Sequence, residues 1–287
     1  MPILLKGAAA AAAMAEETAL RAQKLQKQGV QPKLAIVRVG ERPNNLSYEK
    51  SAIKRCEKIG VAYECYTLPE DATQEQLEEI IVHINEDDAI HGCLMFRPLP
   101  PHIDEGKVCA LLRPDKDVDG ITHASISGVY TDSGEGYPPC TAKACMVLLN
   151  HYGIPIQGKR VVVLGRSLVI GKPVAMLLLQ KDATVTLCHS KSENLRAICQ
   201  EADIIIAAIG KMELVDGGFI RPDGTQTVID VGIHVKEDGR LTGDVDFDAV
   251  SDLVSAITPV PGGIGAVTTS ILVEHVICAA ELKAKMK

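Results

Sequence analysis

The chain has few aromatic residues and no tryptophan. Its 287 residues include only 3 Phe and 6 Tyr, whereas 46% of them are hydrophobic. The interior must therefore be built mainly from aliphatic side chains. A chain of this length and composition can bury a sizeable aliphatic core, and its length favours two domains.

Paired cysteines, long apolar runs and a leader segment are also lacking. The nine cysteines form no Cys-x-x-Cys pair, and several lie inside apolar runs, where they behave as small hydrophobic residues. No stretch approaches membrane-spanning length, and the first residues carry Lys6 and Gly7 where a signal peptide needs its apolar centre. These absences predict a cytoplasmic protein in a reducing compartment, without a membrane partner.

Positive charge is scarce as well. The formal net charge is −7, and no run of basic residues or alternation of basic and aromatic residues interrupts the acidic average. The sequence therefore argues against a nucleic-acid surface. A local basic patch for a small anionic ligand remains possible.

Short apolar runs alternate with helical patterns in the first half. A run of alanines, 8–13, leads into a helix because alanine is the best helix former. Glycine closes the strand at Gly40 and the helix at Gly60. The predicted strands are 34–40, 61–68 and 92–96, and the predicted helices are 47–59 and 74–86.

The second half repeats this alternation. A helix over 144–152 precedes strands that begin at Val161 and recur at 184–188, 204–208, 228–231 and 256–257, and a last helix covers 268–285. Alternating strands and helices imply parallel sheets. We therefore predict an α/β fold of two domains, each a mainly parallel sheet with flanking helices, the second Rossmann-like. The predicted boundaries are 1–138, completed by the C-terminal helix 268–287, and 139–267.

A glycine-bracketed turn follows the apolar run 161–164. It contains Gly165, Arg166, Ser167 and Gly171, in the pattern Gly-x-Ser-x-x-x-Gly. In such a turn backbone N–H groups and the positive end of the next helix face a pyrophosphate. The pattern departs from Gly-x-Gly-x-x-Gly, and a plain strand-turn-helix connection is the alternative. The turn predicts a dinucleotide site.

The next strand distinguishes the two nicotinamide dinucleotides. It ends in His189, Ser190 and Lys191, without the acidic residue that accepts from a ribose 2′-OH. Arg166, Ser190 and Lys191 can instead donate to a 2′-phosphate. NADP is therefore favoured over NAD. The alternative interpretation of Arg166 is an ordinary solvated loop arginine.

Four further motifs are predicted to converge on a cleft between the domains, because parallel sheets bind ligands at the carboxyl ends of their strands. They are Tyr48, the segment 96–100, the acidic turn 117–120 and the proline- and glycine-rich loop 259–265. Each has an ordinary alternative, namely helix packing, a tight turn or a loop breaker. Calcium is not expected at the acidic turn, since no ligand-rich loop follows it, and no metal is predicted.

Together these motifs resemble the methylenetetrahydrofolate dehydrogenase/methenyltetrahydrofolate cyclohydrolase family over nearly the whole chain. The resemblance rests on motifs in this order: Tyr48 with Lys54 and Gly60, Pro98-Leu99-Pro100, Lys116-Asp117-Val118-Asp119-Gly120, Pro139-Cys140-Thr141, Gly165-Arg166-Ser167, Gly171-Lys172-Pro173, Asp230-Val231-Gly232-Ile233, Gly243-Asp244-Val245 and Pro259-Val260-Pro261-Gly262-Gly263-Ile264-Gly265.

The resemblance implies a homodimer that binds a tetrahydrofolate substrate in the first domain and NADP in the second. It implies that Tyr48 stacks on the folate, that Asp119 holds the pterin and that Ile233 lies by the nicotinamide. It assigns the 2′-phosphate to Arg166 and Ser190. The other substrate-binding residues that it implies are Pro98, Leu99, Pro261, Gly262 and Gly263.

Two departures from the family pattern concern chemistry. Ala52 stands where the family has a lysine four residues after the tyrosine, and Phe96 replaces a glutamine two residues before Pro-Leu-Pro. Lys54 does not simply substitute, because it lies about 200° round the helix from Ala52. Both replaced residues are expected to serve the cyclohydrolase reaction.

We therefore predict NADP-dependent oxidation of 5,10-methylenetetrahydrofolate, with cyclohydrolase activity weakened or lost. One alternative is a fully bifunctional enzyme that uses a substitute acid/base such as Arg97 or a shifted Lys54. Others are an NADP dehydrogenase of the shikimate type, and a binding remnant without catalysis. The shikimate type would need a Lys-Asp catalytic pair, but Asp119 has no suitably placed lysine, and the loop 259–265 would be unexplained. An intact cofactor cradle argues against the remnant.

Overall fold

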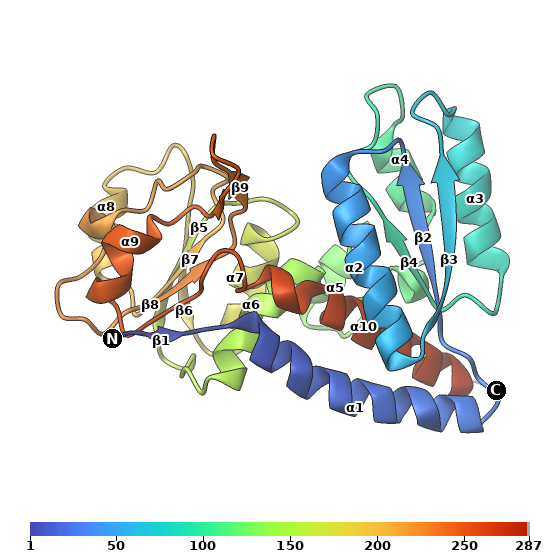
Figure 1. The fold of residues 1–287 in the computed structure, drawn as a ribbon, viewed down its shortest axis with the longest axis horizontal. Helices are drawn as coiled ribbons and strands as arrows, with labels where there is room; N and C mark the ends of the chain where they lie inside the picture. Colours follow the sequence, from blue (N-terminus) through green and yellow to red (C-terminus); the bar gives the residue numbers. More distant parts are fainter. Residues whose placement is uncertain (286–287) are drawn as a thin grey trace. The chain divides into compact units, whose positions relative to one another are not determined.

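The aliphatic runs form parallel strands in two separate sheets, which confirms the predicted α/β fold (Figure 1). The structure, a computed structural model, describes residues 1–285. The chain divides into two units, of which unit 1 contains Met1–Ala12 and Thr141–Thr268, and unit 2 contains Ala13–Cys140 and the residues from Thr269 onward. Three helices contribute residues to both units: α1 (Gly7–Lys27), α6 (Cys140–His151), of which only Cys140 belongs to unit 2, and α10 (Gly265–Lys285). Of the predicted C-terminal helix, residues 286 and 287 lie outside the described part.

Unit 2 is built on a three-stranded parallel sheet of order β3-β2-β4. The central strand β2 (Lys33–Val39) is buried from its second residue onward, because β3 (Ala62–Leu68) and β4 (Gly92–Met95) pair with it on both sides. The helical segments of unit 2 are α2 (Pro43–Ile59), α3 (Gln74–Glu86), α4 (Glu105–Leu111), η1 (Pro114–Lys116) and α5 (His123–Thr131).

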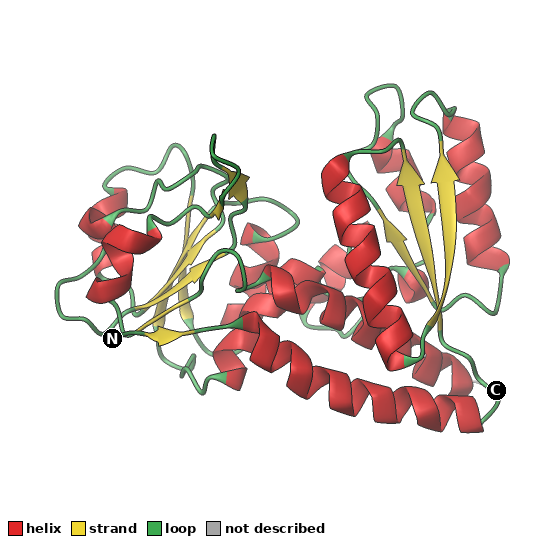
Figure 2. Ribbon diagram, in the orientation of Figure 1, coloured by secondary structure: helices red, strands yellow, loops and turns green. Residues whose placement is uncertain are grey.

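Unit 1 is built on a six-stranded parallel sheet of order β1-β11-β8-β7-β5-β6, flanked by helices as Figure 2 shows. The strands are β1 (Ile3–Leu4), β11 (Ala256–Ile257), β8 (Thr227–Asp230), β7 (Ile204–Ala207), β5 (Arg160–Leu164) and β6 (Thr184–Cys188). The helical segments are α6 (Cys140–His151), α7 (Gly171–Leu179), α8 (Leu195–Gln200), η2 (Gly217–Phe219), α9 (Phe247–Val250) and η3 (Ser251–Leu253). A two-stranded antiparallel sheet pairs β9 (His234–Val235) with β10 (Leu241–Thr242).

Local sequence explains where several helices begin and end. Thr73 and Gln76 form a reciprocal capping box at the start of α3, which satisfies two backbone N–H groups. Gly60 ends α2 at a φ of 87°, a left-handed conformation that glycine adopts without steric penalty. Both features place the boundary at the residue that the sequence predicted.

Other boundaries differ from the prediction. Helix α2 begins at Pro43 rather than at residue 47, because proline fits the first turn of a helix, where its missing N–H is not needed. Helix α6 likewise begins at Cys140, four residues earlier than predicted. The short strand β1 was missed, since a two-residue strand has no periodicity and forms only by pairing with β11.

Helix α10 is long and apolar enough to cross a membrane, so the prediction that no stretch approaches that length was wrong. However, 67% of its most apolar 18-residue window is buried inside the protein. An all-round apolar helix is typical of a protein core as well as of a membrane span. The burial of α10 accounts for its composition.

Candidate functional site

The predicted phosphate cradle lies between β5 and α7 in unit 1. Gly165 has a φ of 124°, and a Cβ atom there would lie 2.1 Å from the carbonyl oxygen of Ala208. A Cβ on Gly171 would lie 2.1 Å from the oxygen of Gly165. Both positions therefore require glycine, because the turn packs closely on the backbone of Ala208 and on itself at the N-terminus of α7. Such a terminus favours a phosphate group through its free N–H groups and helix dipole.

The turn itself is ordered by short-range contacts. The Ile170 N–H donates to Ser167 Oγ at 3.2 Å, and the Lys172 N–H donates to the Ser167 carbonyl at 3.0 Å. Ser167 thus holds the turn from both its side chain and its backbone. The four predicted residues of the cradle form one continuous strand-turn-helix.

The residues predicted to receive a 2′-phosphate follow neighbouring strands. Leu164 of β5 is in register with Cys188 of β6, so Arg166 and Ser190 each come two residues after a paired position. Both are exposed, and Ser190 lies in a turn where the His189 N–H donates to Ser192 Oγ at 3.0 Å. Two exposed donors at adjacent strand ends can face one anionic group.

A buried carboxylate, Asp244, shapes the loop that follows β7. Its oxygens accept from the backbone N–H groups of Ile209, Gly210 and Lys211 at 2.6, 2.9 and 3.0 Å. His234 Nε2 lies 2.8 Å from Asp244 Oδ1. This single side chain therefore ties the loop after β7 to the start of β9.

A second buried carboxylate, Asp230, ends β8. It accepts from the N–H groups of Gly232, Asp244 and Val245 at 2.9, 3.0 and 2.9 Å. Burial raises the pKa of Asp230 to about 6, and these three hydrogen bonds oppose the shift. Asp230 thereby holds the segment that places Asp244.

Ile233, predicted to lie by the nicotinamide, follows this network. Ile233 is 63% exposed, which is unusual for isoleucine, and its Cδ1 lies near Gly265 at the start of α10. The loop with Pro261, Gly262 and Gly263 belongs to the same unit, and the Gly7 N–H donates to the Gly262 oxygen at 2.8 Å. An exposed apolar residue beside rigid loops can contact a flat ring.

In unit 2 the structure brings Tyr48 and Phe96 together. Their ring centroids are 6.0 Å apart and their planes are at 84°, an edge-to-face contact. Tyr48 lies on α2, and Phe96 follows β4 and is 8% exposed. The ring of Phe96 thus occupies space next to Tyr48, the residue that is expected to stack on the folate.

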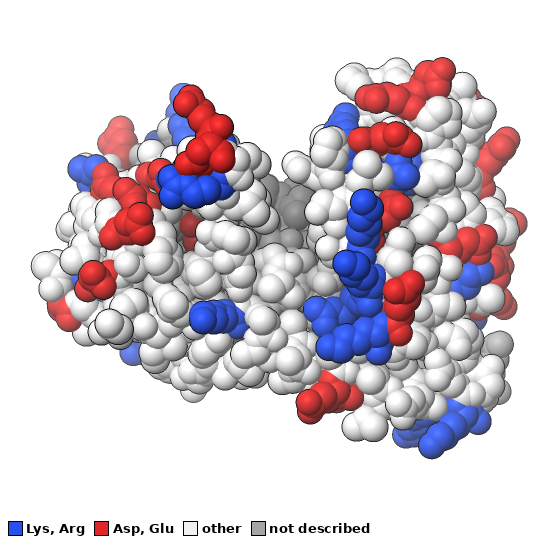
Figure 3. All heavy atoms as spheres, in the orientation of Figure 1, with Lys and Arg blue, Asp and Glu red and all other residues white. Residues whose placement is uncertain are grey.

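Ala52 shares the helical face of Tyr48 and has no exposed surface. Lys54 is exposed, as are Lys50 and Lys58, and Figure 3 shows basic side chains gathered over α2. The nearest lysines of this helix therefore lie in solvent, whereas position 52 is covered. The predicted separation of Lys54 from Ala52 is confirmed.

The segment after Phe96 is held by two side chains. Arg42 Nη1 donates to the Pro98 carbonyl at 2.9 Å, and Glu105 Oε2 accepts from the Leu99 N–H at 2.9 Å. Arg97 also faces Glu105, with 3.5 Å between Nη1 and Oε1. These contacts fix Pro98 and Leu99 beside the start of α2.

Asp119 differs from the other acidic residues of its turn. Asp117 is wholly buried and accepts from the N–H groups of Ile121 and Thr122 and from Ser125 Oγ, at 2.9, 2.7 and 2.6 Å. Asp119 accepts from the backbone and thiol of Cys140 and stays partly exposed. Burial raises the pKa of Asp119 to about 6, and the hydrogen bond from the Cys140 thiol opposes this shift.

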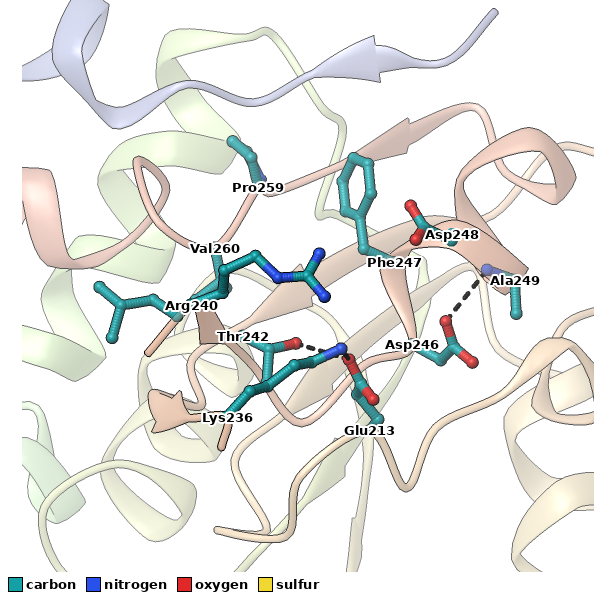
Figure 4. A pocket seen from close by; sticks show the side chains of 11 residues that line it. Glu213, Lys236, Arg240, Thr242, Asp246, Phe247, Asp248, Ala249, Pro259 and Val260 are labelled. Carbon is teal, nitrogen blue, oxygen red and sulfur yellow. Dashed lines mark hydrogen bonds and ion pairs between the residues drawn. The ribbon is translucent and has the colours of Figure 1, made fainter. Parts of the chain in front are cut away.

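A separate cavity of about 630 Å³ lies beside β9, β10 and α9 (Figure 4). Lys236 pairs with Glu213 there, and Thr242 Oγ1 donates to the same carboxylate at 2.9 Å. The lining mixes both charges with Phe247, and none of the predicted cofactor residues contributes to it. This cavity is therefore distinct from the glycine cradle.

Metal-binding clusters and disulfides do not occur in the described part of the chain. No group of three His, Cys, Asp or Glu side chains among residues 1–285 is placed to hold a metal ion. The nine cysteines are free, and burial raises the pKa of the Cys93 and Cys140 thiols above the ordinary range. Buried thiols of this kind are structural rather than reactive.

A glycine cradle at the end of a parallel strand, beside a strand tip without an acidic residue, defines an α/β enzyme of the nicotinamide-dinucleotide class. Two family models match the chain: "Tetrahydrofolate dehydrogenase/cyclohydrolase, catalytic domain" over residues 5–119, and the corresponding "NAD(P)-binding domain" over 139–284. The chain belongs to the tetrahydrofolate dehydrogenase/cyclohydrolase family. This confirms the resemblance and the predicted class of enzyme and cofactor.

Individual relatives match over almost their full length. The "Bifunctional protein FolD" of Carboxydothermus hydrogenoformans is 49% identical over 280 residues, 97% of each chain. That of Clostridioides difficile is 48% identical and covers 98% of this chain and 97% of its own. The chain is accordingly similar to these enzymes throughout both units.

Solved structures agree. The FolD enzyme of Campylobacter jejuni is 37% identical, with a TM-score of 0.95 over 98% of this chain and 99% of its own. The enzyme of Trypanosoma brucei, solved with NADP and an inhibitor, is 35% identical, with a TM-score of 0.91 over 98% of each chain. Membership of this family sets aside the shikimate-type alternative.

The sequence located the cradle and the two replaced positions, but it missed several residues that shape the site. No role was assigned from sequence to Asp244, Asp230 or Glu105. An acidic residue at the end of an apolar strand, as at Asp230, marks such a role only once its backbone partners are known. The predicted convergence of the loops at a cleft between the units stays a prediction.

Proposed function

We propose that this protein oxidises 5,10-methylenetetrahydrofolate to 5,10-methenyltetrahydrofolate with NADP⁺ and has weak or no cyclohydrolase activity. The observation that carries the second part is the covered face of α2. Ala52 is fully buried there, and Phe96 packs against the neighbouring Tyr48. An acid/base group is missing from the position where the family pattern has its lysine.

Unit 2 supplies the groups that hold the folate in this proposal. Tyr48 offers an aromatic face for stacking, and Asp119 offers a partly exposed carboxylate to the N–H groups of the pterin. Pro98 and Leu99, which Arg42 and Glu105 hold beside the start of α2, are the further substrate contacts in this proposal. The family pattern also implies contacts from Pro261, Gly262 and Gly263 of unit 1. In this proposal the folate-binding domain spans residues 1–138 and is completed by the C-terminal helix.

Unit 1 supplies the cofactor site. When bound at Gly165–Gly171, NADP⁺ provides the hydride acceptor, and the chain's own part is to orient it. Arg166 and Ser190 are the donors available to the 2′-phosphate, and no acidic residue at the strand tip opposes it. The preference for NADP over NAD follows from this arrangement. In this proposal the NADP-binding domain spans residues 139–267.

Dehydrogenation requires positioning and no proton transfer from a side chain. The nitrogen lone pairs of the substrate stabilise the cation that forms as the methylene carbon loses its hydride. Orientation of donor and acceptor at about 3–3.5 Å supplies much of the barrier reduction. Stacking at Tyr48, the carboxylate of Asp119 and a rigid cradle are sufficient for this task.

Cyclohydrolysis makes a further demand. Water must add to the cation, and a ring nitrogen must then leave with a proton, so a general acid/base contributes about 10²–10⁴-fold. Neither alanine nor phenylalanine can transfer a proton. Lys54 is exposed and lies on another face of α2.

A bifunctional enzyme with a substitute group is the second candidate. Arg97 favours it, since burial raises the pKa of the Asp119 carboxyl group and the positive charge of Arg97 partly opposes that shift. Arginine stays protonated near neutrality, however, and is a poor proton donor. The water that adds to the cation would then depend on Asp119 rather than on a lysine.

We also propose a homodimer that works in the cytoplasm in one-carbon metabolism. Its support is the family's implication together with the nine unpaired cysteines, which suit a reducing compartment. Sedimentation of the purified protein tests the dimer directly.

Two assays on the purified protein test the function. One follows oxidation of methylenetetrahydrofolate with NADP⁺, and the other follows hydrolysis of supplied methenyltetrahydrofolate above the uncatalysed rate. Robust oxidation with background hydrolysis is the expected result. Fast hydrolysis would contradict the proposed loss, and absence of both activities would leave a binding remnant.

The double variant A52K/F96Q provides the matched gain-of-function arm. The glutamine removes the ring that packs on Tyr48, and the two changes together restore both residues of the family pattern. We expect hydrolysis to rise about 10²-fold while oxidation changes little. Lys54→Ala is the control, and its hydrolysis rate should equal that of the parent protein.

A further inference from the structure

The carbonyl group of Val118 lies between two donors from distant parts of unit 2. His275 Nδ1 is 2.9 Å from this oxygen, and Cys140 Sγ is 3.5 Å from it. Because a carbonyl oxygen can only accept, the Nδ1 atom of His275 carries the proton. A histidine of the C-terminal helix α10 therefore donates to the acidic turn 157 residues earlier in the chain.

The imidazole ring is held in place by its surroundings. His275 is 5% exposed, and the ring of Tyr137 lies 4.8 Å from it at an interplanar angle of 34°. Packing of this kind fixes the plane of the imidazole and thereby the direction of its N–H. The hydrogen bond to Val118 is accordingly preorganised.

The rest of the turn is anchored by other groups. The carboxylate of Asp117 takes three hydrogen bonds from the segment 121–125. A Cβ on Gly120 would lie 2.6 Å from the Pro139 nitrogen and the Tyr137 oxygen, so the turn packs closely on the segment before α6. These contacts fix both ends of the turn.

The peptide between Val118 and Asp119 is the remaining link. Its carbonyl and the N–H of Asp119 belong to one planar unit, so the direction of the carbonyl sets the orientation of the Asp119 backbone. The Cα–Cβ bond of Asp119 follows from that orientation. A donor on the Val118 oxygen thus controls where the carboxylate points.

We propose that His275 is a positioning residue that aims the Asp119 carboxylate at the folate substrate through its hydrogen bond to the Val118 carbonyl. The inference rests on the proposed function of Asp119 and adds a residue that does not itself contact the substrate. Without the Nδ1 proton, the buried carbonyl keeps only the longer contact with the Cys140 thiol, and the peptide is held less firmly.

Three variants in the full-length protein test this. His275→Phe keeps a ring against Tyr137 and removes the donor, whereas His275→Asn keeps a donor at the position of Nδ1. Asp119→Ala reports on the proposed substrate site. For each, folate and NADP dissociation constants and the KM and kcat of oxidation are measured, with thermal unfolding to verify folding.

We expect H275F to weaken folate binding about tenfold and to leave NADP binding within about twofold, while H275N restores folate binding. In the D119A background, H275F should have no additional effect on folate, because it acts through the missing carboxylate. His275→Leu replaces H275F where the latter does not fold, with the same expectation.

Unchanged folate binding in folded H275F, or an equal loss in H275N, overturns the inference. So does an additional loss in the double variant D119A/H275F. If D119A leaves folate binding unchanged, the role of Asp119 fails first, and the proposal for His275 falls with it. A loss that affects folate and NADP equally would show a merely structural role.

Discussion

The two units use buried carboxylates in different ways. In unit 1, Asp230 and Asp244 each accept three backbone N–H groups, and Asp244 also faces His234. In unit 2, Asp117 likewise takes three donors, whereas Asp119 accepts from Cys140 and keeps part of its surface exposed.

The difference separates structural carboxylates from the one that we propose to bind the substrate. A carboxylate has about four lone-pair positions, so three or four backbone and side-chain donors leave little capacity for a ligand. Such a group shapes loops. Asp119 retains acceptor capacity on a turn that its neighbour Asp117 has already made rigid, and this combination suits a substrate with N–H donors.

The largest effect is expected for Asp244→Ala. It leaves three buried N–H groups without an acceptor, and we expect a loss of about 3–5 kcal/mol in the free energy of unfolding. Denaturant unfolding with and without NADP measures this. Asp246→Ala is the control, because Asp246 is a helix cap that bonds the Ala249 N–H at 3.2 Å, and its loss costs about 1 kcal/mol.

If the two substitutions lower the free energy of unfolding equally, Asp244 stabilises the fold no more than a helix cap does. The contrast between structural and binding carboxylates would then fail. A stable D244A protein with normal NADP affinity would show that the loop after β7 holds its shape by itself.

Asp119→Ala should act on binding rather than on folding. We expect the folate dissociation constant to rise about 10–100-fold, because a charged hydrogen-bond acceptor is lost, while NADP binding stays unchanged. Titration of each ligand separately measures both. If D119A unfolds the protein as D244A does, the assignment of one structural and one binding carboxylate is wrong.

The pH dependence of folate binding sharpens the assignment. The pKa of Asp119 is raised to about 6, so its carboxylate is protonated below that pH and can no longer accept from the pterin. We expect the folate KM to rise as the pH falls through about 6, by up to about tenfold per pH unit. In D119A the profile should be flat over this range.

The smallest expected effect concerns stability against pH. The folded-state pKa of Asp119 lies above its unfolded value near 3.8, so the folded protein binds more protons between about pH 4 and 6. Wild type should therefore lose about 1–2 kcal/mol relative to D119A as the pH rises through this window. Denaturant unfolding at several pH values measures the difference, and a constant difference would contradict the raised pKa.

Much of the fold followed from sequence, and the reason is local. Strand β5 and the turn after it were predictable because an apolar run and two glycines describe the backbone directly. The same holds for α3, whose cap residues Thr73 and Gln76 are only three positions apart in the chain. The replaced positions 52 and 96 were also visible, because they stand in otherwise continuous motifs.

Features built from distant segments were not predictable. Strand β1 exists by pairing with β11, and Asp244 acquires its partners from the loop after β7. The burial of Ala52 next to the Tyr48–Phe96 contact also depends on packing between α2 and the end of β4. Composition and periodicity carry no information about such pairings.

The sequence by itself determined the class of fold, the glycine cradle and the missing lysine, and it supports the proposed preference for a 2′-phosphate, because each depends on residue type at short spacing. Only the tertiary structure decided which carboxylates accept hydrogen bonds from backbone N–H groups, and which donor reaches the Val118 carbonyl. Hydrogen bonds between residues 35 or 157 positions apart depend on how the elements pack, and burial then sets the protonation of the groups involved.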